Sequence, residues 1–413
     1  MKMIRYISRL LTGIVFIFSG FVKAVDPAGS AIKFREYFEA FHLDFLVFTA
    51  VPLAIALSAA ELMIGLNLLA RFRMKFTAWT LLIFMAFFSL LTLLLALTNP
   101  VSDCGCFGDA LKLTNWQTFG KNVLLLIPTL VVFYGRAELS VPAFKYEWAM
   151  VAFNFVIACL LSVYCILHQP LLDFRPYGTG THIPDKMTIP EGAPLDEYET
   201  ILVYEKNGVQ QEFTDQNFPW QDTLWKWVET RQKLIRKGYE PPIHDFSITC
   251  SDGSDITPEV LADTGYTFVL IAPDLEHTSA KGMQRLNDLA LRCNELGFRS
   301  ICLSSSANSQ VSEFINAFQP AFEICSADET TLKTIIRANP GLMLLQRGTI
   351  LGKWNYRDAP QPDELRRNML SVVLTKQRVK TDVFAVIIIS LCILVIYSLI
   401  FNLIMSRSND TNK

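Results

Sequence analysis

Apolar residues in this chain gather into long runs and seldom alternate with polar ones. A run of about 20 apolar residues is long enough to cross a bilayer. Six runs approach that length: Leu10–Val22, Phe45–Ala70, Phe76–Leu97, Val123–Tyr134, Trp148–Leu167 and Val383–Met405. The pattern predicts a multi-pass α-helical membrane protein. Because no cleavage site for a signal peptide follows the first run, we expect that run to be retained.

Basic residues indicate how these spans are oriented. Lysine and arginine are enriched in the cytoplasmic loops of membrane proteins. If the six spans alternate, most loop cations fall on one side: Lys2, Arg5, Arg9, Arg71, Arg73, Lys75, Arg136 and Lys145, against Lys376, Arg378 and Lys380 on the other. We therefore expect an inner-membrane protein with both termini cytoplasmic. The loop near residue 104 and residues of about 170–381 would then be periplasmic.

The segment between the first two runs has aromatic residues at helical spacing. Phe34, Phe38, Phe41 and Phe45 recur every three or four residues, opposite charged side chains. Such a pattern is typical of an amphipathic helix. Two arrangements fit it equally well: a helix lying on the outer membrane face, or a helical hairpin packed on the bundle.

Between residues 244 and 377, short buried runs alternate with helical patterns. Three strands are predicted, each followed by a helix, and then a hairpin and a last helix, Asp363–Val373. This order implies a mainly parallel sheet that is covered on both faces, with the hairpin as its antiparallel edge. The strands are "TFVLIA", "SICLSS" and "FEICSA", their helices are Lys281–Leu296, "QVSEFINAF" and "DETTLKTIIRA", and the hairpin is "NPGLMLLQRGTILGKWNY".

Residues 170–243 begin with a region rich in proline and glycine. In "ETILVYEKNGVQQEF" the "KNG" is a turn signal between two strands. "WQDTLWKWVETRQKLIRKG" then reads as a helix that ends at Gly238. Trp220 and Trp227 are seven residues apart, so they would share one face of that helix. We expect this face to be part of a core, although a docking surface is the alternative.

The order of elements after residue 244 resembles the thioredoxin-like fold in its peroxiredoxin and TlpA-like form. The matching pieces are "HDFSITCSDGSDIT", "YTFVLIAPDLEHTSA" and "NPGLMLLQRGTILGKW", in which Pro340 is the candidate cis-proline. Redox-active members carry Cys-x-x-Cys at the start of the first helix, where this chain reads Pro273–Ser279 without a cysteine. The resemblance therefore implies a domain without dithiol chemistry at that position.

The membrane half resembles the DoxX-like family and, within it, the methylamine utilisation protein MauE. The matching residues are in "RLLTGIVFIFSGFVKAVDP", in "AAELMIGLNLLA" and in "DCGCFGD", over roughly residues 5–135. MauE-like proteins are implicated in disulfide formation in an exported dehydrogenase subunit. This resemblance implies a part in thiol–disulfide chemistry or in maturing exported proteins.

The expected fold class is an α-helical membrane bundle of about four helices plus two anchor spans, joined to an α/β thioredoxin-like domain. Five segments follow: the DoxX/MauE-like module 1–137, a transmembrane helix 148–168, an extension 170–243, the thioredoxin-like domain 244–377, and a C-terminal transmembrane helix 383–405. Composition agrees, with 51% hydrophobic residues and a net charge of -2. That charge argues against nucleic acid as a partner.

Cys104 and Cys106 are the first candidate for chemistry. A Cys-x-Cys disulfide closes a small strained ring, which makes it more reducible, and Gly105 removes a side chain from that ring. Asp103 and Asp109 would raise the pKa of nearby thiols and disfavour the thiolate. A redox relay, structural bridges and a buried turn all remain open. A metal site is not expected because further ligands are missing nearby.

Glu61 is the second candidate. It lies ten residues before Arg71, hence near the bilayer centre, where a lone carboxylate is costly. We expect an ion pair between Glu61 and Lys23, with Ser19 as a hydrogen-bond donor. The pair would act as a structural clamp or as part of a functional site.

The remaining cysteines are expected to be structural, and His277 in the loop before the first helix is expected to be solvated. Cys159, Cys165 and Cys392 lie in apolar runs and read as small core residues. The four in the soluble part, Cys250, Cys293, Cys302 and Cys325, permit two bridges but equally suit plain burial.

Two functions compete for the whole chain. The first is a membrane protein that assists thiol–disulfide exchange through Cys104 and Cys106, with exported proteins as partners, a quinone as the candidate cofactor, and the soluble domain as a non-catalytic partner-binding module. The second is a non-enzymatic envelope scaffold with structural cysteines. Transport of a small lipid-soluble compound rests on Glu61 alone and ranks last.

Overall fold

The computed structural model describes residues 1–101, 103–140, 146–366, 368–379, 381–382 and 385. Within these residues, five helices are long and apolar enough to cross a membrane, which confirms the first five predicted spans. They comprise α1 (Lys2–Val25), α3 (Ala50–Ala70, led by the 3-10 helix Asp44–Thr49), α4 (Met74–Thr98), α5 (Asn115–Tyr134) and α7 (Glu147–Leu167). The sixth predicted span lies outside the described residues except at position 385.

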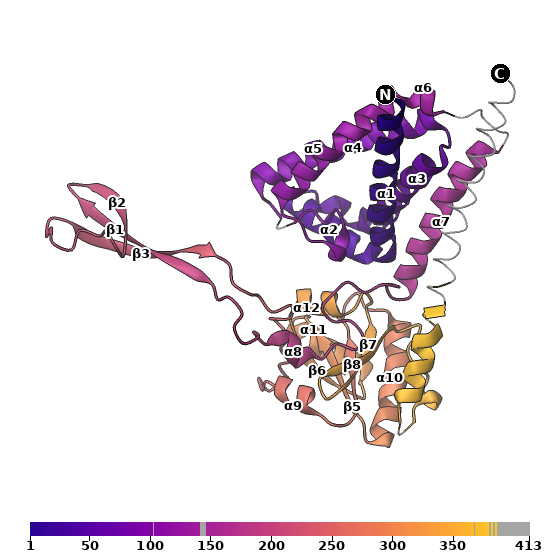
Figure 1. Cartoon of the computed structure of the whole chain (residues 1–413). Coiled ribbons are helices and arrows are strands. Elements are labelled where there is room, and N and C mark those ends of the chain that lie inside the picture. Colours follow the sequence, from indigo (N-terminus) through magenta and orange to yellow (C-terminus); the bar gives the residue numbers. More distant parts are fainter. Residues whose placement is uncertain (102, 141–145, 367, 380, 383–384, 386–413) are drawn as a thin grey trace.

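Helices α1 and α3 form the centre of the bundle because glycines let their backbones approach (Figure 1). A Cβ atom added at Gly20 would lie 2.5 Å from the backbone nitrogen of Leu62, and one at Gly65 would lie 2.7 Å from that of Ile17. Small residues at such contacts are typical of membrane helices. Large apolar side chains such as Ile83, Leu90 and Leu124 point outward, where they contact lipid.

Helix α2 (Pro27–Ala40) decides between the two arrangements of the aromatic segment. Phe34 and Phe38 pack against Ala50 and Ala54 of α3. The segment is therefore a helical hairpin packed on the bundle. Phe45, beyond the end of α2, is exposed.

The soluble domain is built on a five-stranded sheet of order β6-β5-β4-β7-β8. Strands β4 (Thr267–Ile271), β5 (Arg299–Ser304) and β6 (Glu323–Ser326) are parallel, whereas β7 (Gly341–Gln346) and β8 (Thr349–Asn355) form an antiparallel hairpin beside β4. The strand and helix order confirms the predicted thioredoxin-like fold. The helices between the strands are α10 (Ala280–Leu296), α11 (Asn308–Phe318) and α12 (Glu329–Ile335).

Both faces of the sheet are buried. Along β4, Phe268 and Leu270 join one core with α10, while Val269 and Ile271 join a second core with α12. This alternation follows from the two-residue period of a strand. The second core also includes Ile183 of the short helix α8 (Ile183–Met187) and Val260 of α9 (Thr257–Ala262).

Two predictions of secondary structure are wrong. The tryptophan-rich segment is not a helix: β3 (Lys226–Arg236) pairs with β1 (Glu197–Lys206), which also pairs with β2 (Val209–Thr214). These strands form an arm that extends away from the domain (Figure 1), and Trp220 and Trp227 are exposed on it. The helix predicted at Asp363–Val373 begins only at residue 370, after the 3-10 helix Pro362–Glu364, and the described residues 370–379, 381–382 and 385 are helical.

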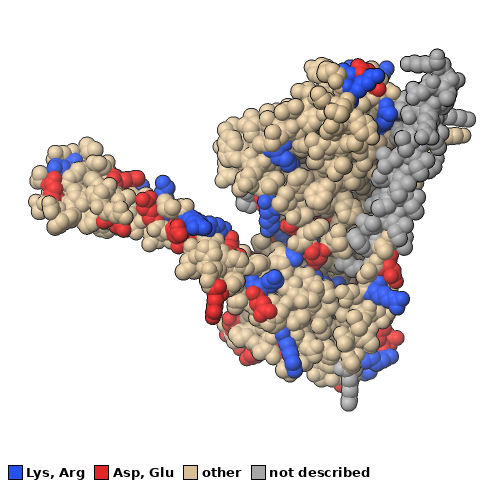
Figure 2. Space-filling view, in the orientation of Figure 1, with Lys and Arg blue, Asp and Glu red and all other residues tan. Residues whose placement is uncertain are grey.

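The soluble domain sits on one end of the bundle, at the end that carries the Cys104 loop. Arg337 reaches from the domain to Asp26, with Nε 3.0 Å from a carboxylate oxygen, and to Asp109, at 2.7 Å. His168 at the end of α7 pairs with Asp358, 2.8 Å away. Figure 2 shows that charged side chains gather at the two ends of the bundle and leave its sides mostly uncharged.

Candidate functional site

The loop between α4 and α5 is held by its two ends. Asn99 closes α4 in the left-handed conformation and accepts a hydrogen bond from Asn115, which also donates to the carbonyl of Val101. Thr114 caps α5 and forms a capping box with Gln117. Between these anchors the loop carries Cys104 and Cys106 back over the bundle.

Side chains from α1 and α2 fix the carbonyl groups of both cysteines. The hydroxyl of Tyr37 donates to the carbonyl of Cys104 at 2.7 Å. The carbonyl of Cys106 accepts from the hydroxyl of Ser19 at 3.0 Å and from the ammonium of Lys23. The loop backbone is therefore fastened at each sulfur-bearing residue.

The ion pair expected from the sequence is present in the bundle. Lys23 Nζ lies 2.8 Å from Glu61 Oε2 and donates to Ser19 Oγ at 2.7 Å. Both charged side chains are buried, with exposed fractions of 5% and 7%. Because Lys23 also reaches Cys106, this pair connects the centre of α3 to the loop.

Gly105 allows the turn between the two cysteines. Its φ of +61° lies in the left-handed region, which costs glycine little. A Cβ atom there would also lie 2.9 Å from Cγ of Lys33. Its N–H group donates to Asp103 at 3.0 Å.

The acids beside the cysteines act differently from the expectation. Asp103 pairs with Lys33 at 3.1 Å and Asp109 with Arg337 at 2.7 Å. Their charges are therefore met by cations. The sequence predicted that Asp103 and Asp109 would disfavour a thiolate at Cys104. Paired with cations, they do not.

The two thiols differ in acidity. A hydrogen bond from the Cys106 thiol lowers the pKa of Cys104 to about 6, helped by Thr118 and the charge of Lys121 and opposed by burial. The same hydrogen bond, together with burial, raises the pKa of Cys106. At neutral pH Cys104 is the thiolate and Cys106 its proton-bearing neighbour, an arrangement that favours nucleophilic chemistry at Cys104.

A cavity of about 300 Å³ opens beneath the two cysteines. Its wall is mainly apolar and aromatic, and its polar groups include the Lys23–Glu61 pair, Lys121 and Asn122. The lining comes from α1 to α5 and from the loop itself. Such a cavity suits an apolar molecule with a few polar atoms.

The thioredoxin-like domain has no cysteine at the position where redox-active proteins of this fold carry Cys-x-x-Cys. The loop Pro273–Ser279 precedes α10, and His277 there is exposed and paired with Asp274 at 2.8 Å. The peptide bond before Pro340 is cis, as expected. Asn339 donates to the carbonyl of Asp274 at 2.7 Å, which joins the two loops.

Four cysteines lie inside this domain, and only two of them meet. Cys250 and Cys325 have their sulfur atoms 2.6 Å apart, whereas Cys293 and Cys302 are each fully buried. Burial raises the pKa of both Cys293 and Cys302 to about 12. Cys165 in α7 is a buried core residue, and Cys159 in the same helix is partly buried. Cys392 lies outside the described residues.

Three site residues were missed by sequence reasoning. Tyr37 and Arg337 act on the loop from distant parts of the chain, and Lys121 acts on it from α5, the helix that follows it. Only Tyr37 left a signal, since it is a tyrosine within the aromatic segment. Nothing in the sequence around Arg337 pointed to a contact with residue 109.

Comparison with protein families gives two matches. Residues 1–135 match the family described as methylamine utilisation protein MauE. This part of the chain is a MauE domain. Residues 198–237, which make up the arm, match a domain of unknown function (DUF8463).

Comparison with other proteins adds little to the MauE assignment. Curated proteins gave no match to the chain. Among solved structures, the solution structure of a Neisseria meningitidis protein assigned as a thioredoxin is similar at 14% identity, with a TM-score of 0.24. The match covers 32% of this chain and 88% of that protein. The thioredoxin-like fold therefore rests on the strand order of the sheet.

Proposed function

We propose that the MauE domain assists the maturation of exported proteins by thiol–disulfide exchange at Cys104 and Cys106. One observation carries this proposal: Cys104 and Cys106 lie together in the lining of the bundle cavity, where the interaction between them lowers the pKa of Cys104 to about 6 and raises that of Cys106. A pair with such unequal acidity is suited to exchange, because the thiolate is the reactive form.

The exchange step is balanced in atoms and electrons. A thiolate of the exported protein attacks the sulfur of Cys106 in the Cys104–Cys106 disulfide, and Cys104 leaves as the thiolate because the thiol of lower pKa leaves faster. The second thiol of the exported protein then attacks the mixed disulfide. The exported protein gains a disulfide, and the pair gains two electrons and two protons.

A second acceptor must remove those electrons for the pair to turn over, and we propose a membrane quinone. Oxidation of the dithiol releases two electrons and two protons, which convert a quinone to a hydroquinone. The mainly apolar cavity beneath the cysteines supports this choice, since it has aromatic walls and a few polar groups beside the sulfur atoms.

The proposed setting is the cell inner membrane, with the loop and the soluble domain in the periplasm and both termini in the cytoplasm. Two observations support it. The soluble domain and the Cys104 loop meet at one end of the bundle through Arg337, so they share a compartment. Disulfides also persist in the oxidising periplasm.

We assign the soluble domain a non-catalytic role in binding partners. The lack of a cysteine in the loop Pro273–Ser279 supports this, as does the exposed arm with its tryptophans. The alternative is an envelope scaffold in which Cys104 and Cys106 only hold the loop. The ion pairs of Arg337 with Asp26 of the bundle and with Asp109 of the loop favour that alternative, in which the contact is purely mechanical.

The experiment that tests the proposal is the redox state of Cys104 and Cys106 in intact cells. The other seven cysteines are replaced, and thiols are trapped with a membrane-permeant alkylating mass tag. We expect a mixture of oxidised and reduced forms that becomes more reduced when quinone synthesis is blocked. The matched control carries Cys104→Ser and has no such mixture.

Two outcomes would contradict the proposal. A pair that stays fully oxidised in all conditions, or fully reduced and unreactive, would make the loop structural and leave the scaffold in its place. If the ratio of oxidised to reduced protein does not change when quinone synthesis is blocked, the exchange reaction is still supported, but a quinone is not the electron acceptor.

A further inference from the structure

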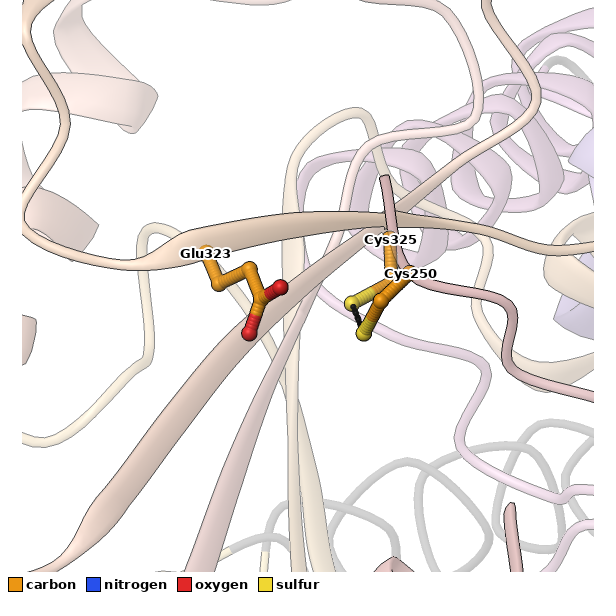
Figure 3. Close-up of side chains that lie close together, drawn as sticks. All are labelled: Cys250, Glu323 and Cys325. Carbon is orange, nitrogen blue, oxygen red and sulfur yellow. Dashed lines mark hydrogen bonds between the residues drawn. The ribbon is translucent and has the colours of Figure 1, made fainter. Parts of the chain in front are cut away.

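Cys250 and Cys325 are brought together from 75 positions apart in the chain. Their sulfur atoms lie 2.6 Å from each other, a separation too short for two thiols in ordinary van der Waals contact. Figure 3 shows the two side chains pointing at one another from two neighbouring backbone segments. Both residues are buried, with exposed fractions of 7% and 1%.

The backbone around the pair already has the geometry of a cross-strand link. Thr249 and Ser326 form an antiparallel bridge, with their N–H groups donating to each other's carbonyls at 3.0 and 2.7 Å. In an antiparallel pairing, the next pair along is Cys250 and Cys325, at a position without direct hydrogen bonds, where the two side chains are closest. That approach falls within the range a disulfide requires.

A metal ion does not explain the cluster. Glu323 completes a group of three potential ligand atoms with the two sulfurs, but Figure 3 shows its carboxylate to one side of them. Two thiolates on one tetrahedral zinc ion, with bonds of about 2.3 Å, are held about 3.8 Å apart. The observed sulfur separation is far shorter than that.

We propose that Cys250 and Cys325 form a disulfide that fastens the segment returning from the arm to the edge strand β6. Two thiols lose two protons and two electrons to form the bond. The electrons pass to a protein or small-molecule disulfide, which is reduced to two thiols. The bond is separate from the exchange proposed at Cys104 and Cys106 and does not depend on it.

The position of the link explains what it would do. Strand β3 of the arm ends at Arg236, and the chain then returns to the domain through Ile243, Phe246 and Ile248, all buried. Cys250 ends this return segment, and Cys325 lies on β6, the outer strand of the sheet. The disulfide would hold the return segment in place against any force on the arm, and it would also cover an exposed sheet edge.

The chemistry of the pair suits a stable link better than an exchange centre. Burial is the main cause that raises the pKa of both Cys250 and Cys325. Once reduced, these residues would stay as thiols at neutral pH and would attack other disulfides slowly.

The test is peptide mapping of the full-length protein from cells whose free thiols are blocked by an alkylating agent before lysis. We expect one peptide pair that is linked through Cys250 and Cys325, with neither cysteine alkylated. Recovery of both residues in alkylated form, or of zinc bound to the purified protein in proportion to it, would overturn the proposal.

A second measurement uses thermal unfolding with and without a reducing agent. Reduction should lower the midpoint of the soluble domain by about 5–10 °C in the wild type. The Cys250→Ala variant should show no such shift, whereas the control Cys293→Ala, another buried cysteine, should keep it. A shift that persists in Cys250→Ala would place the sensitive bond elsewhere. If that variant does not fold, the peptide map of the wild type still decides.

Discussion

The two close cysteine pairs of this chain differ in almost every respect except their residue type. Cys104 and Cys106 are separated by one glycine, on a loop over a cavity. Cys250 and Cys325 are far apart in sequence and meet across two backbone segments at the edge of a sheet. In the first pair one pKa falls to about 6, whereas in the second both pKa values rise.

The comparison teaches that neighbours decide what a cysteine pair can do. Cys104 has hydrogen-bond donors and the cation Lys121 around it, which stabilise a thiolate. Cys325 has burial and the nearby carboxylate of Glu323, which oppose one. The first pair is therefore suited to exchange and the second to a lasting bond.

Replacing Cys104 or Cys106 by serine should have the largest effect, because it removes the exchange reaction from the first pair and leaves the second pair intact. We expect membrane vesicles with either variant to oxidise a reduced dithiol peptide at least about 100-fold more slowly. Each variant lacks one sulfur of the Cys104–Cys106 disulfide that accepts the two electrons of the peptide, so neither variant can carry out the exchange. The control Cys250→Ala should stay within twofold of the wild-type rate. Equal rates in all variants would reject the exchange reaction.

Glu61→Gln should destabilise the bundle that carries the first pair. It leaves the buried ammonium of Lys23 without a carboxylate, and breaking a buried pair in this way costs about 3 kcal/mol of unfolding free energy. Denaturation in detergent micelles measures the change. The control Glu39→Gln removes the same charge from an exposed position of α2 and should change little. An unaltered stability of Glu61→Gln would show that the clamp is unimportant.

The pH dependence of alkylation should separate the two pairs after reduction. A thiol with a pKa of about 6 is about one-tenth ionised at pH 5 and about nine-tenths ionised at pH 7, so its alkylation rate should rise about tenfold and then level off. A thiol of ordinary pKa near 8.5 would rise about 100-fold over the same range and continue to rise above pH 7. Cys250 and Cys325, whose pKa values are raised, should be alkylated more slowly than a thiol of ordinary pKa. Mass spectrometry of each peptide against time gives the rates, and a Cys104 rate without a plateau would contradict the assignment.

Lys121→Gln should have the smallest effect. It tests whether a nearby cation contributes to the difference in pKa between the two cysteine pairs. The charge of Lys121 helps to lower the pKa of Cys104, so its loss should raise that pKa and slow alkylation at pH 6 by about two- to threefold. The control is Lys112→Gln, which removes an exposed lysine from the loop before α5. If both variants behave alike, the effect of Lys121 is not specific.

Local sequence patterns predicted the elements that bury their own periodic faces. The five described spans, the alternating strands and helices from β4 to β8, and the Lys23–Glu61 pair followed from run length, period and helical rise. The arm did not. Its β3 was predicted to be part of a helix that ends at Gly238, yet pairing with β1 along its length decided the structure. Such tertiary pairing often outweighs local preference.

The electrostatics of the loop were also beyond sequence reasoning. Asp103 and Asp109 are close to the cysteines in sequence, which suggested a raised pKa. Their partners Lys33 and Arg337 lie 70 and 228 residues away, and the hydrogen bond between the thiols depends on a backbone turn. Charges that meet only in the folded chain cannot be paired from spacing.

The contact of Arg337 with Asp26 and Asp109 sets an order of events during synthesis. Asp109 leaves the ribosome 228 residues before the arginine that binds it, which at 5–20 residues per second is a delay of about 10–45 s. During that interval the loop over the cavity has Lys33 but not Arg337. The junction between domain and bundle therefore forms only after strands β4, β5 and β6 of the thioredoxin-like sheet have been synthesised, so the loop over the cavity gains this contact long after the bundle helices have been made.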